Sequence, residues 1–326
     1  MLENIECDLC GSANKKFLFK QKDIIHNVTS EEFSLVRCNE CDLCYLCPRP
    51  NESEMSKYYS KEYNFYKQSG IFSKIINLLI SILIRFKFII HLINYIPIKK
   101  LKEICILRIK PKIKYPYEFN SKTFFLDIGC GSGDSIHFWK DYYSVNNLSS
   151  KFNNIYAIEP AMEAYNSIKL PLKRKKQLLE SFNSIKFNHI RMNWSLEHVH
   201  YPSKYFNFVR DNINDDGKFL LCIPNYDGLI YKIDEKNIEV PIHLFHFKYE
   251  DINKYCEKAG LKIIDFKTFS YPGMYFYSSK INDKFQSFKN ITPLEAFNFN
   301  KSIKLFDKMG LGNDMIFVIK KINYSG

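Results

Sequence analysis

Short apolar runs alternate with longer polar segments along the chain beyond Pro116. Buried parallel strands have this continuous apolar character, and crossover helices separate them along a sequence. The pattern therefore predicts an α/β fold with a mostly parallel sheet. The expected strands are 123–128, 155–159, 187–193, 218–223, 262–269 and 315–322, with a weaker candidate at 176–179. We expect the last two strong strands to form an antiparallel pair that closes the sheet.

A different pattern precedes the sheet, an apolar stretch at 71–96 that is long enough to span a bilayer. Arg85 and Lys87 lie near its middle, where a charge is costly in hydrocarbon, so we do not expect a spanning helix. Its polar residues recur mostly every three or four positions, which draws a narrow polar stripe along a helix. Two interpretations stay open: a helix buried between domains, or a helix that lies in a membrane interface with its cations toward the headgroups.

The composition indicates a folded chain with a substantial core. Of its 326 residues, 46% are hydrophobic and 16% aromatic, with 12 glycines and 12 prolines. These values exclude a disordered, collagen-like or low-complexity chain. The formal net charge is +12, and the segment 71–116 holds ten basic residues against one acid, which accounts for +9 of that charge. Such a block attracts anionic partners, whether nucleic acid, phospholipid or a phosphorylated substrate.

The cysteines are concentrated at the N-terminus, where six of the ten fall in the first 47 positions. The first residues have neither the basic nor the apolar region of a secretory signal, so we expect a cytoplasmic protein, with the inner membrane face as a place of peripheral contact. In a reducing compartment, closely paired cysteines are more typical of metal ligands than of disulfides. Cys7-x2-Cys10 and Cys38-x2-Cys41 form two knuckles that can close a tetrahedral zinc site.

The expected zinc is structural, because four thiolates leave no open coordination position. Cys44 and Cys47 extend the second knuckle into a run that is similar to an iron–sulfur motif, although the spacing of its last cysteine differs. We interpret these two cysteines as packing residues, with an iron–sulfur cluster as the alternative.

A glycine-rich loop follows the first expected strand and has the form Asp127-x-Gly129-x-Gly131-x-Gly133. Glycines let the backbone turn tightly and approach a ligand, and a following helix presents free N–H groups to it. The loop therefore favours nucleotide binding. It does not fit the dinucleotide fingerprint G-x-G-x-x-G, because Asp134 occupies the sixth position.

With Glu159 at the end of the second expected strand, this loop resembles that of class I S-adenosylmethionine-dependent methyltransferases. The resemblance covers about 120–270 and includes the segments 192–199 and 215–225. It implies a Rossmann-like seven-stranded sheet, a loop around the methionine portion of the cofactor, and a carboxylate on the ribose hydroxyls. The cofactor-binding residues that it implies are Asp127, Gly129, Cys130, Gly131, Gly133, Glu159, Pro160 and Asn193.

The acceptor of a methyl group must lose a proton, and His198 is the best candidate for the base because an imidazole titrates near neutrality. Glu197 could orient or polarise it, although both residues could also only cap or pack a helix. Some related quinone-pathway enzymes hold a divalent ion with Glu-x-x-Glu-His, but Trp194 stands at the first position here, which argues against that site. We expect His200 to face solvent. His243 and His246 lie where this fold builds its acceptor lid, and aromatic packing is their favoured role.

The N-terminal segment resembles the zinc-knuckle front end of certain bacterial methyltransferases, including deoxysugar C-methyltransferases. We therefore expect a zinc-binding module at 1–66, a basic helical connector at 67–117 and a methyltransferase domain at 118–326. The predicted function is methyl transfer from S-adenosylmethionine to a small molecule, with a sugar or glycan intermediate, phosphorylated or nucleotide-linked, as the favoured acceptor. A zinc-containing RNA base methyltransferase and a non-catalytic scaffold are the alternatives. The Asn/Asp-Pro-Pro-Tyr/Phe motif of base-amine methylation is absent, which disfavours nucleic acid.

Overall fold

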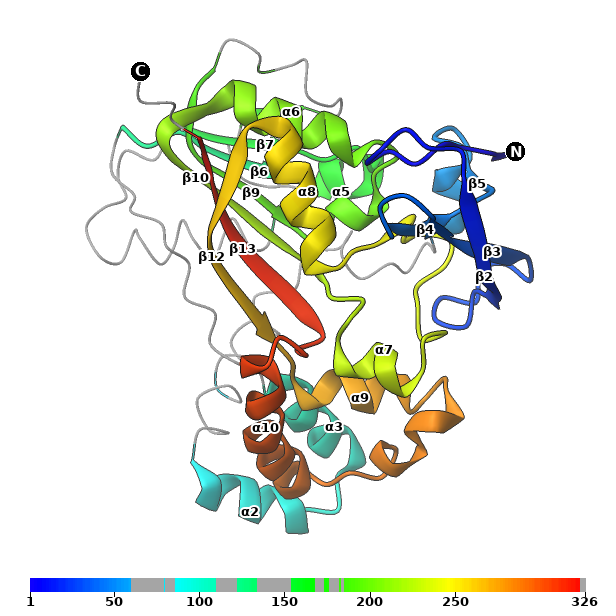
Figure 1. Cartoon of the computed structure of the whole chain (residues 1–326). Helices are drawn as coiled ribbons and strands as arrows, with labels where there is room; N and C mark the ends of the chain where they lie inside the picture. Colours follow the sequence, from blue (N-terminus) through cyan, green and yellow to red (C-terminus); the bar gives the residue numbers. More distant parts are fainter. Residues whose placement is uncertain are drawn as a thin grey trace.

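The structure is a computed structural model. It describes residues 1–59, 79, 86–109, 122–133, 154–167, 173–175, 182 and 185–322. A twisted central sheet carries the N-terminal cysteine-rich module on one side and a group of helices below it in the view of Figure 1.

The central sheet has the order β12-β13-β10-β9-β6-β7-β8. Its strands are β6 (Phe125–Ile128), β7 (Ile155–Ile158), β8 (Lys173–Lys175), β9 (Phe187–Asn193), β10 (Ile213–Pro224), β12 (Leu261–Phe269) and β13 (Asp314–Lys321). Pairing is parallel from β8 to β10, whereas β13 runs antiparallel to both of its neighbours. The expected α/β fold and its closing antiparallel pair are confirmed. The strand order reverses between β6 and β9, and open α/β sheets bind ligands at such a point, outside the carboxyl ends of the strands.

The observed strands agree with the strong candidates to within two residues, except at the start of β10. β9 has the expected bounds, but β10 begins at Ile213, ahead of the expected 218, with an irregular register against β9 between these positions. The weak strand expected at 176–179 lies outside the described residues, and β8 occupies the preceding Lys173–Lys175. β8 is a sheet edge made of three cations, and an edge tolerates charges that an apolar pattern does not reveal.

Helices and turns connect the strands. They are α5 (Met162–Ser167), η4 (Leu196–His198), α6 (Pro202–Asn212), α7 (Leu229–Ile233) and α8 (Tyr249–Ala259). α6 begins with a proline, whose fixed φ suits the first turn, and α8 ends at Gly260 in the left-handed conformation. The two helices pack on each other through the stacked rings of Phe206 and Tyr255, whose centroids are 5.1 Å apart.

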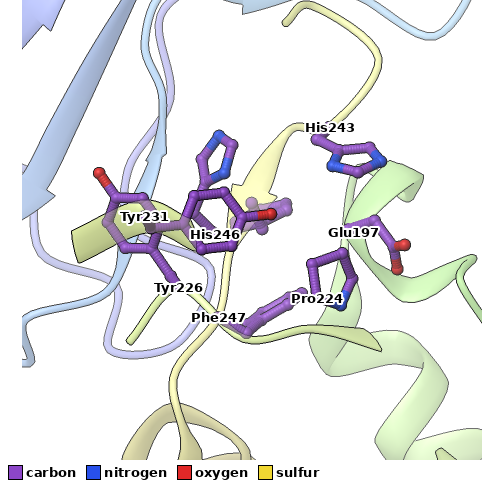
Figure 2. A pocket seen from close by; sticks show the side chains of 8 residues that line it. Glu197, Pro224, Tyr226, Tyr231, His243, His246 and Phe247 are labelled. Atoms are coloured by element: carbon purple, nitrogen blue, oxygen red, sulfur yellow. The ribbon is translucent and has the colours of Figure 1, made fainter. Parts of the chain in front are cut away.

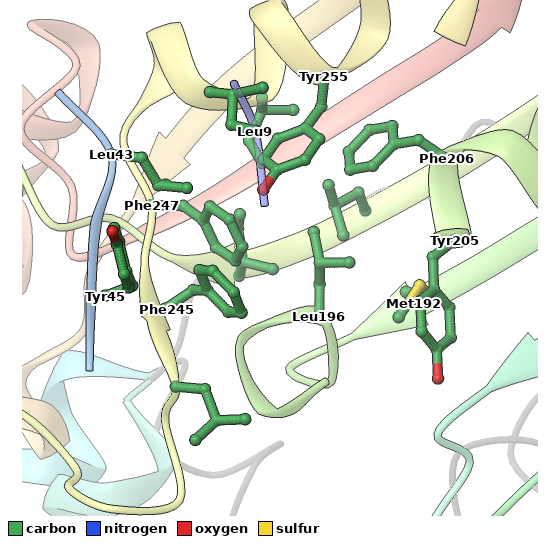
Figure 3. Close-up of a cluster of buried hydrophobic side chains, with 14 of the residues drawn as sticks. Leu9, Leu43, Tyr45, Met192, Leu196, Tyr205, Phe206, Phe245, Phe247 and Tyr255 are labelled. Carbon is green, nitrogen blue, oxygen red and sulfur yellow. The ribbon is translucent and has the colours of Figure 1, made fainter. Parts of the chain in front are cut away.

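The cysteine-rich module is continuous with the rest of the molecule. It contains β1 (Leu2–Glu3), β2 (Lys15–Lys22), β3 (Glu32–Cys38), β4 (Cys44–Leu46), β5 (Arg49–Pro50) and η1 (Met55–Tyr58). Its larger sheet has the order β11-β4-β3-β2. The edge strand β11 (Phe245–His246) comes from a distant part of the chain. Figure 3 shows Leu9, Leu43 and Tyr45 of the module in one buried cluster with Phe206 and Tyr255. The cysteine-rich module and the central sheet thus share a core.

The helices below the sheet combine two distant segments. They are α2 (Lys87–Tyr95) and α3 (Lys99–Arg108) from the expected connector, with α9 (Pro272–Ser278), η5 (Asp283–Phe288) and α10 (Pro293–Lys308) from between β12 and β13. Their core contains Ile90, Ile93, Cys105, Ile106, Ile109, Phe276 and Ala296. Most of the stretch 71–85 lies outside the described residues. Within the described part, no helix is both long and apolar enough to cross a membrane.

Candidate active site

The glycine loop after β6 turns through left-handed backbone conformations. φ is +72° at Gly129, +55° at Gly131 and +76° at Gly133. A Cβ atom at Gly129 would also lie 2.5 Å from the Cβ of Ser195, which is far inside van der Waals contact. A glycine is therefore required at position 129 for two reasons: its left-handed φ and the close approach of the loop to the segment after β9.

Glu159, directly after β7, fixes the glycine loop. Its Oε2 accepts a hydrogen bond from the backbone N–H of Gly131 at 2.7 Å, and its Oε1 accepts one from Ala161 at 2.9 Å. Burial raises the pKa of this carboxyl, while the two N–H groups and their hydrogen bonds act in the opposite direction. A carboxylate has about four acceptor positions, so each oxygen keeps room for one more donor.

Asp127 is paired with a second buried side chain. Both of its carboxylate oxygens accept hydrogen bonds from the guanidinium of Arg191, which lies opposite it on β9, and both side chains are buried. The sequence analysis missed Arg191, although a cation inside an apolar strand beside a buried acid is the signal of such a pair. The pair joins β6 to β9 beneath the loop.

The turn from Asn193 to His198 links the loop to a second polar region. Ser195 donates its hydroxyl to the carbonyl oxygen of Ile128 at 3.1 Å. Trp194 has a φ of +48° and donates its indole N–H to Asp314 at 3.1 Å. The side-chain oxygen of Asn193 is buried without a hydrogen-bond partner among the described residues. Three residues span at most about 10 Å, so His198 lies close to the point where Ser195 meets Gly129.

The other predicted cofactor residues, Cys130 and Pro160, flank these contacts. Cys130 is buried in the loop, and burial raises the pKa of its thiol well above the usual value. Its carbonyl accepts from the N–H of Gly133 at 3.1 Å, which closes the turn. Pro160 is exposed next to Glu159. The structure therefore brings all eight predicted cofactor residues to the carboxyl ends of β6, β7 and β9.

Two histidines and a glutamate come together at the end of η4. Glu197, His198 and His243 each offer a side-chain N or O atom, and these atoms lie within 4.8 Å of one another. Nε2 of His198 is 3.9 Å from Oε1 of Glu197, and the rings of His198 and His243 meet edge to face with centroids 4.7 Å apart. His243 comes from the loop before β11, so the fold supplies a partner that the local motif did not show. We call these three residues the histidine cluster.

Hydrogen bonds set the orientation of His198. Its Nδ1 lies 2.9 Å from the carbonyl oxygen of Ile242 and 3.2 Å from the hydroxyl of Tyr59. A carbonyl oxygen can only accept, so Nδ1 carries the proton and Nε2 keeps its lone pair. Tyr59 belongs to the N-terminal segment, and the sequence analysis did not give it a role at this site.

Burial controls protonation throughout the histidine cluster. It lowers the pKa of His198 to about 3, with the nearby His243 as the next cause, and it lowers that of His243 as well. Burial raises the pKa of Glu197 well above its usual value. Apart from contact with its own backbone N–H, neither carboxylate oxygen of Glu197 has a hydrogen-bond partner among the described residues. The imidazoles are thus neutral near pH 7, and Glu197 holds its proton more strongly than an exposed acid.

A pocket opens beside the histidine cluster. Figure 2 shows Glu197 and His243 on one side of it and His246 with two tyrosines on the other. The lining residues are Glu197, Pro224, Tyr226, Tyr231, His243, Phe245, His246 and Phe247. Burial lowers the pKa of His246 to about 3, and its Nε2 has no partner in the described part of the chain.

The expectation that His200 faces solvent is wrong. His200 is buried, and its Nε2 lies 2.9 Å from the carbonyl oxygen of Pro50. Arg49 donates a hydrogen bond to the carbonyl oxygen of His200 at 2.7 Å. β5 of the cysteine-rich module covers this position, a long-range contact that local spacing cannot reveal.

The four cysteines of the two knuckles meet at one point. Their Sγ atoms lie within 4.8 Å of one another, with 3.5 Å between Cys7 and Cys41 and 3.4 Å between Cys10 and Cys38. Zn–S bonds of about 2.3 Å in a tetrahedron put sulfurs roughly 3.8 Å apart, so the set fits zinc. Cys44 and Cys47 are buried outside this set, and Cys44 approaches the carbonyl oxygen of Asp42 at 3.7 Å.

Both knuckles have the same backbone ending. Four residues after the first cysteine of each knuckle, Gly11 and Asp42 adopt left-handed φ values of +78° and +67°. Gly11 and Asp42 donate their backbone N–H groups to the carbonyl oxygens of Cys7 and Cys38, at 2.7 and 3.1 Å. Asp is among the residues that tolerate this conformation. The second knuckle therefore closes with an aspartate where the first has a glycine.

Comparison with known families defines the class of protein. A family model described as a methyltransferase domain matches residues 91–265, more than half of the chain. The chain therefore belongs to this methyltransferase family, and the predictions of the family and the enzyme class are confirmed.

Among solved structures, the chain is similar to an S-adenosylmethionine-dependent methyltransferase from Clostridium acetobutylicum ATCC 824, with 16% identity and a TM-score of 0.39 over 62% of this chain and 85% of that one. It is also similar to such a methyltransferase from Archaeoglobus fulgidus, with 14% identity and a TM-score of 0.42 over 61% of this chain and 86% of that one. A search of curated proteins found no match.

Proposed function

We propose that this protein transfers a methyl group from S-adenosylmethionine to a small molecule, a sugar or another intermediate of glycan biosynthesis, including phosphorylated or nucleotide-linked forms. The observation that carries the proposal is the turn from Asn193 to His198. One end of this turn touches the glycine loop at Gly129, and the other end carries Glu197 and His198. A methyl donor on the loop and a base for the acceptor would then lie side by side.

The cofactor would lie across the carboxyl ends of β6, β7 and β9. S-adenosylmethionine supplies an activated methyl group on its sulfonium. The left-handed loop from Gly129 to Gly133 lets the backbone approach the cofactor closely, and Glu159 keeps acceptor positions that suit ribose hydroxyls. The Asp127–Arg191 pair would position the loop, because the buried guanidinium on β9 holds both Asp127 oxygens.

His198 would act as the base. Its Nε2 carries a lone pair, and burial lowers its pKa to about 3. The imidazole is therefore neutral near pH 7 but is a weaker base than the near-neutral group expected from the sequence. In-line transfer depends mainly on alignment, so the base has only to remove the proton of the acceptor as the methyl group arrives. Glu197, whose nearest carboxyl oxygen lies 3.9 Å from Nε2, would polarise the ring rather than supply a counter-charge, because burial raises its pKa and favours the neutral acid.

The pocket beside the histidine cluster has a volume of about 10 Å³, roughly one water molecule, so a polyhydroxylated acceptor would enter only if the pocket walls move apart. Its walls combine aromatic faces with imidazole and phenol groups, from Tyr226, Tyr231 and His246. Such side chains offer an apolar body for the carbon face of a sugar and polar tips for its hydroxyls. The site lies among buried residues, which suits a small molecule better than a base within a structured RNA.

We further propose that Cys7, Cys10, Cys38 and Cys41 hold a structural zinc ion. The expected metal content is one zinc per chain, lost on Cys10→Ser and retained on Cys47→Ser, which removes a buried thiol outside the set. Elemental analysis of His243→Gln gives the second control. A further equivalent of metal that this variant loses would mean that the histidine cluster binds an ion and that His198 is not the base.

Two measurements test the proposed function. Calorimetric titration should show S-adenosylmethionine binding that Glu159→Gln weakens, because an amide accepts from only one of the two backbone N–H groups. Asp215→Asn, at an exposed acid, should bind like the wild type. Absence of binding in the wild type would favour a non-catalytic scaffold, and transfer of labelled methyl to RNA alone would favour the nucleic-acid enzyme.

A further inference from the structure

The helix α2 is apolar on two opposite sides. Its inner side packs into the helical lobe through Ile90, which is 0% exposed, and Ile93. Its outer side carries Phe88, Leu92 and Tyr95, which are 71%, 49% and 72% exposed. A surface helix of a globular protein normally has a polar outer side. Burial of the inner side explains why α2 folds here, but it does not explain these three exposed side chains.

The exposed side chains form one face. Positions 88, 92 and 95 follow the i, i+4, i+7 spacing that places residues on the same side of a helix. Phe86 and Ile98 extend the apolar surface beyond the two helix ends and are also exposed. We call Phe88, Leu92 and Tyr95 the outer face of α2. In Figure 1, α2 lies at the outer edge of the helical lobe, far from the cysteine-rich module.

Positive charge adjoins this face. Lys99 and Lys100 are exposed at the start of α3, directly after α2, and no acid occurs between 86 and 102. The first acid, Glu103, is paired with Lys280 at 3.3 Å. Apolar and aromatic side chains beside exposed lysines match the two layers of a lipid surface, with acyl chains below and anionic headgroups above.

We propose that the outer face of α2, together with Lys99 and Lys100, docks on a membrane surface that contains anionic lipid. Phe88, Leu92 and Tyr95 enter the boundary between headgroups and acyl chains, and the two lysines contact phosphate groups. The helix lies in the plane of the interface and does not cross the bilayer. The proposal does not depend on the identity of the acceptor.

Co-sedimentation with vesicles tests the proposal directly. The full-length protein should bind vesicles of phosphatidylcholine and phosphatidylglycerol more strongly than vesicles of phosphatidylcholine alone, and added salt should weaken the difference. The variant Phe88→Ser/Leu92→Ser/Tyr95→Ser should lose at least about tenfold in binding, because each apolar group removed from the bilayer reduces the affinity. Lys99→Gln/Lys100→Gln should remove most of the preference for phosphatidylglycerol.

Phe17→Ser is the matched control. Phe17 is 55% exposed on β2 of the cysteine-rich module, away from α2, and its loss should leave vesicle binding unchanged. All these residues are exposed, so circular dichroism should show the same fold in every variant. Absence of wild-type binding to the anionic vesicles overturns the proposal, as does equal binding by the triple variant. A wild-type dimer in light scattering that the triple variant loses would assign the face to a second copy of the chain.

Discussion

The glycine loop and the histidine cluster are neighbours in the fold, yet the chain builds them in different ways. The loop and Glu159 come from two adjacent strands and depend mainly on backbone geometry: left-handed φ values and two N–H donors to one carboxylate. The histidine cluster joins η4 to the loop before β11, and Tyr59 of the N-terminal segment supports it. One region is a local motif, and the other is assembled from distant segments and contacts Tyr59 of the N-terminal segment.

Because of this difference, we expect the two regions to have separate roles that experiments can distinguish. Changes in the loop should alter the affinity for S-adenosylmethionine, whereas changes in the histidine cluster should alter the rate of methyl transfer. A variant that changes both equally would mean that the two regions do not have separate roles.

The largest effect is expected for His198→Gln, which removes the proposed base. We expect kcat to fall by roughly 10²–10⁴, the usual contribution of a positioned base, with an unchanged Kd for S-adenosylmethionine. His200→Gln is the matched control, because His200 is a buried histidine two residues away whose amide replacement can still hydrogen-bond Pro50. A rate for His198→Gln equal to that of this control would remove His198 from the mechanism.

Gly129→Ala should produce the next largest effect, on cofactor affinity. The new Cβ would have to displace Ser195, and we expect binding of S-adenosylmethionine to weaken at least about tenfold, beyond the 1–2 kcal/mol of a left-handed alanine. Gly260→Ala shares the left-handed conformation, with a φ of +69°, but has open space around it. Gly260→Ala should therefore reduce the stability of the protein without weakening cofactor binding. Ser195→Gly in the Gly129→Ala background should restore part of the cofactor affinity measured by calorimetry.

Glu197→Gln should raise stability in a pH-dependent way. The raised pKa of Glu197 means that the folded protein must take up a proton above the unfolded pKa of about 4.5, and this cost grows as pH rises toward the folded value. The amide has no such cost. At pH 8 the melting temperature of Glu197→Gln should exceed that of the wild type, and the gain should vanish near pH 4.5. A pH-independent difference would show that Glu197 is ionised in the folded state.

Tyr59→Phe should have the smallest effect. Loss of the hydroxyl 3.2 Å from Nδ1 of His198 removes one orienting contact, worth about 0.5–1.5 kcal/mol, so kcat should fall by about 2–12-fold. The neighbouring Tyr58 donates its hydroxyl to Glu31 on the module surface instead. Tyr58→Phe should therefore leave kcat unchanged. Equal rates for the two variants would show that the module does not orient the base.

The sequence predicted what depends on local order. Strand β9 has the expected bounds. The glycine loop contacts Glu159, and, elsewhere in the molecule, the two cysteine knuckles meet each other as their spacing indicated. Arg191, His243 and Tyr59 were not assigned to the site, because each reaches its partner only through strand register or module docking. His200 was misplaced for the same reason, since β5 covers it from a distant part of the chain.

The outer face of α2 is a second arrangement that the sequence pattern alone could not predict. The apolar stretch allowed both a buried and an interfacial helix, and α2 has one buried and one exposed apolar side: Ile90 and Ile93 pack inside while Phe88, Leu92 and Tyr95 are exposed. Periodicity alone could not assign the two sides, because both are apolar.

The most direct test of the account is methyl transfer itself. Purified protein and S-adenosylmethionine with a labelled methyl group would be incubated with fractionated sugar nucleotides, lipid extract and RNA. We predict label in the sugar-nucleotide or lipid-linked glycan fraction with the wild type and almost none with His198→Gln, although both bind the cofactor equally. Label in RNA alone, or equal transfer by His198→Gln, would contradict it.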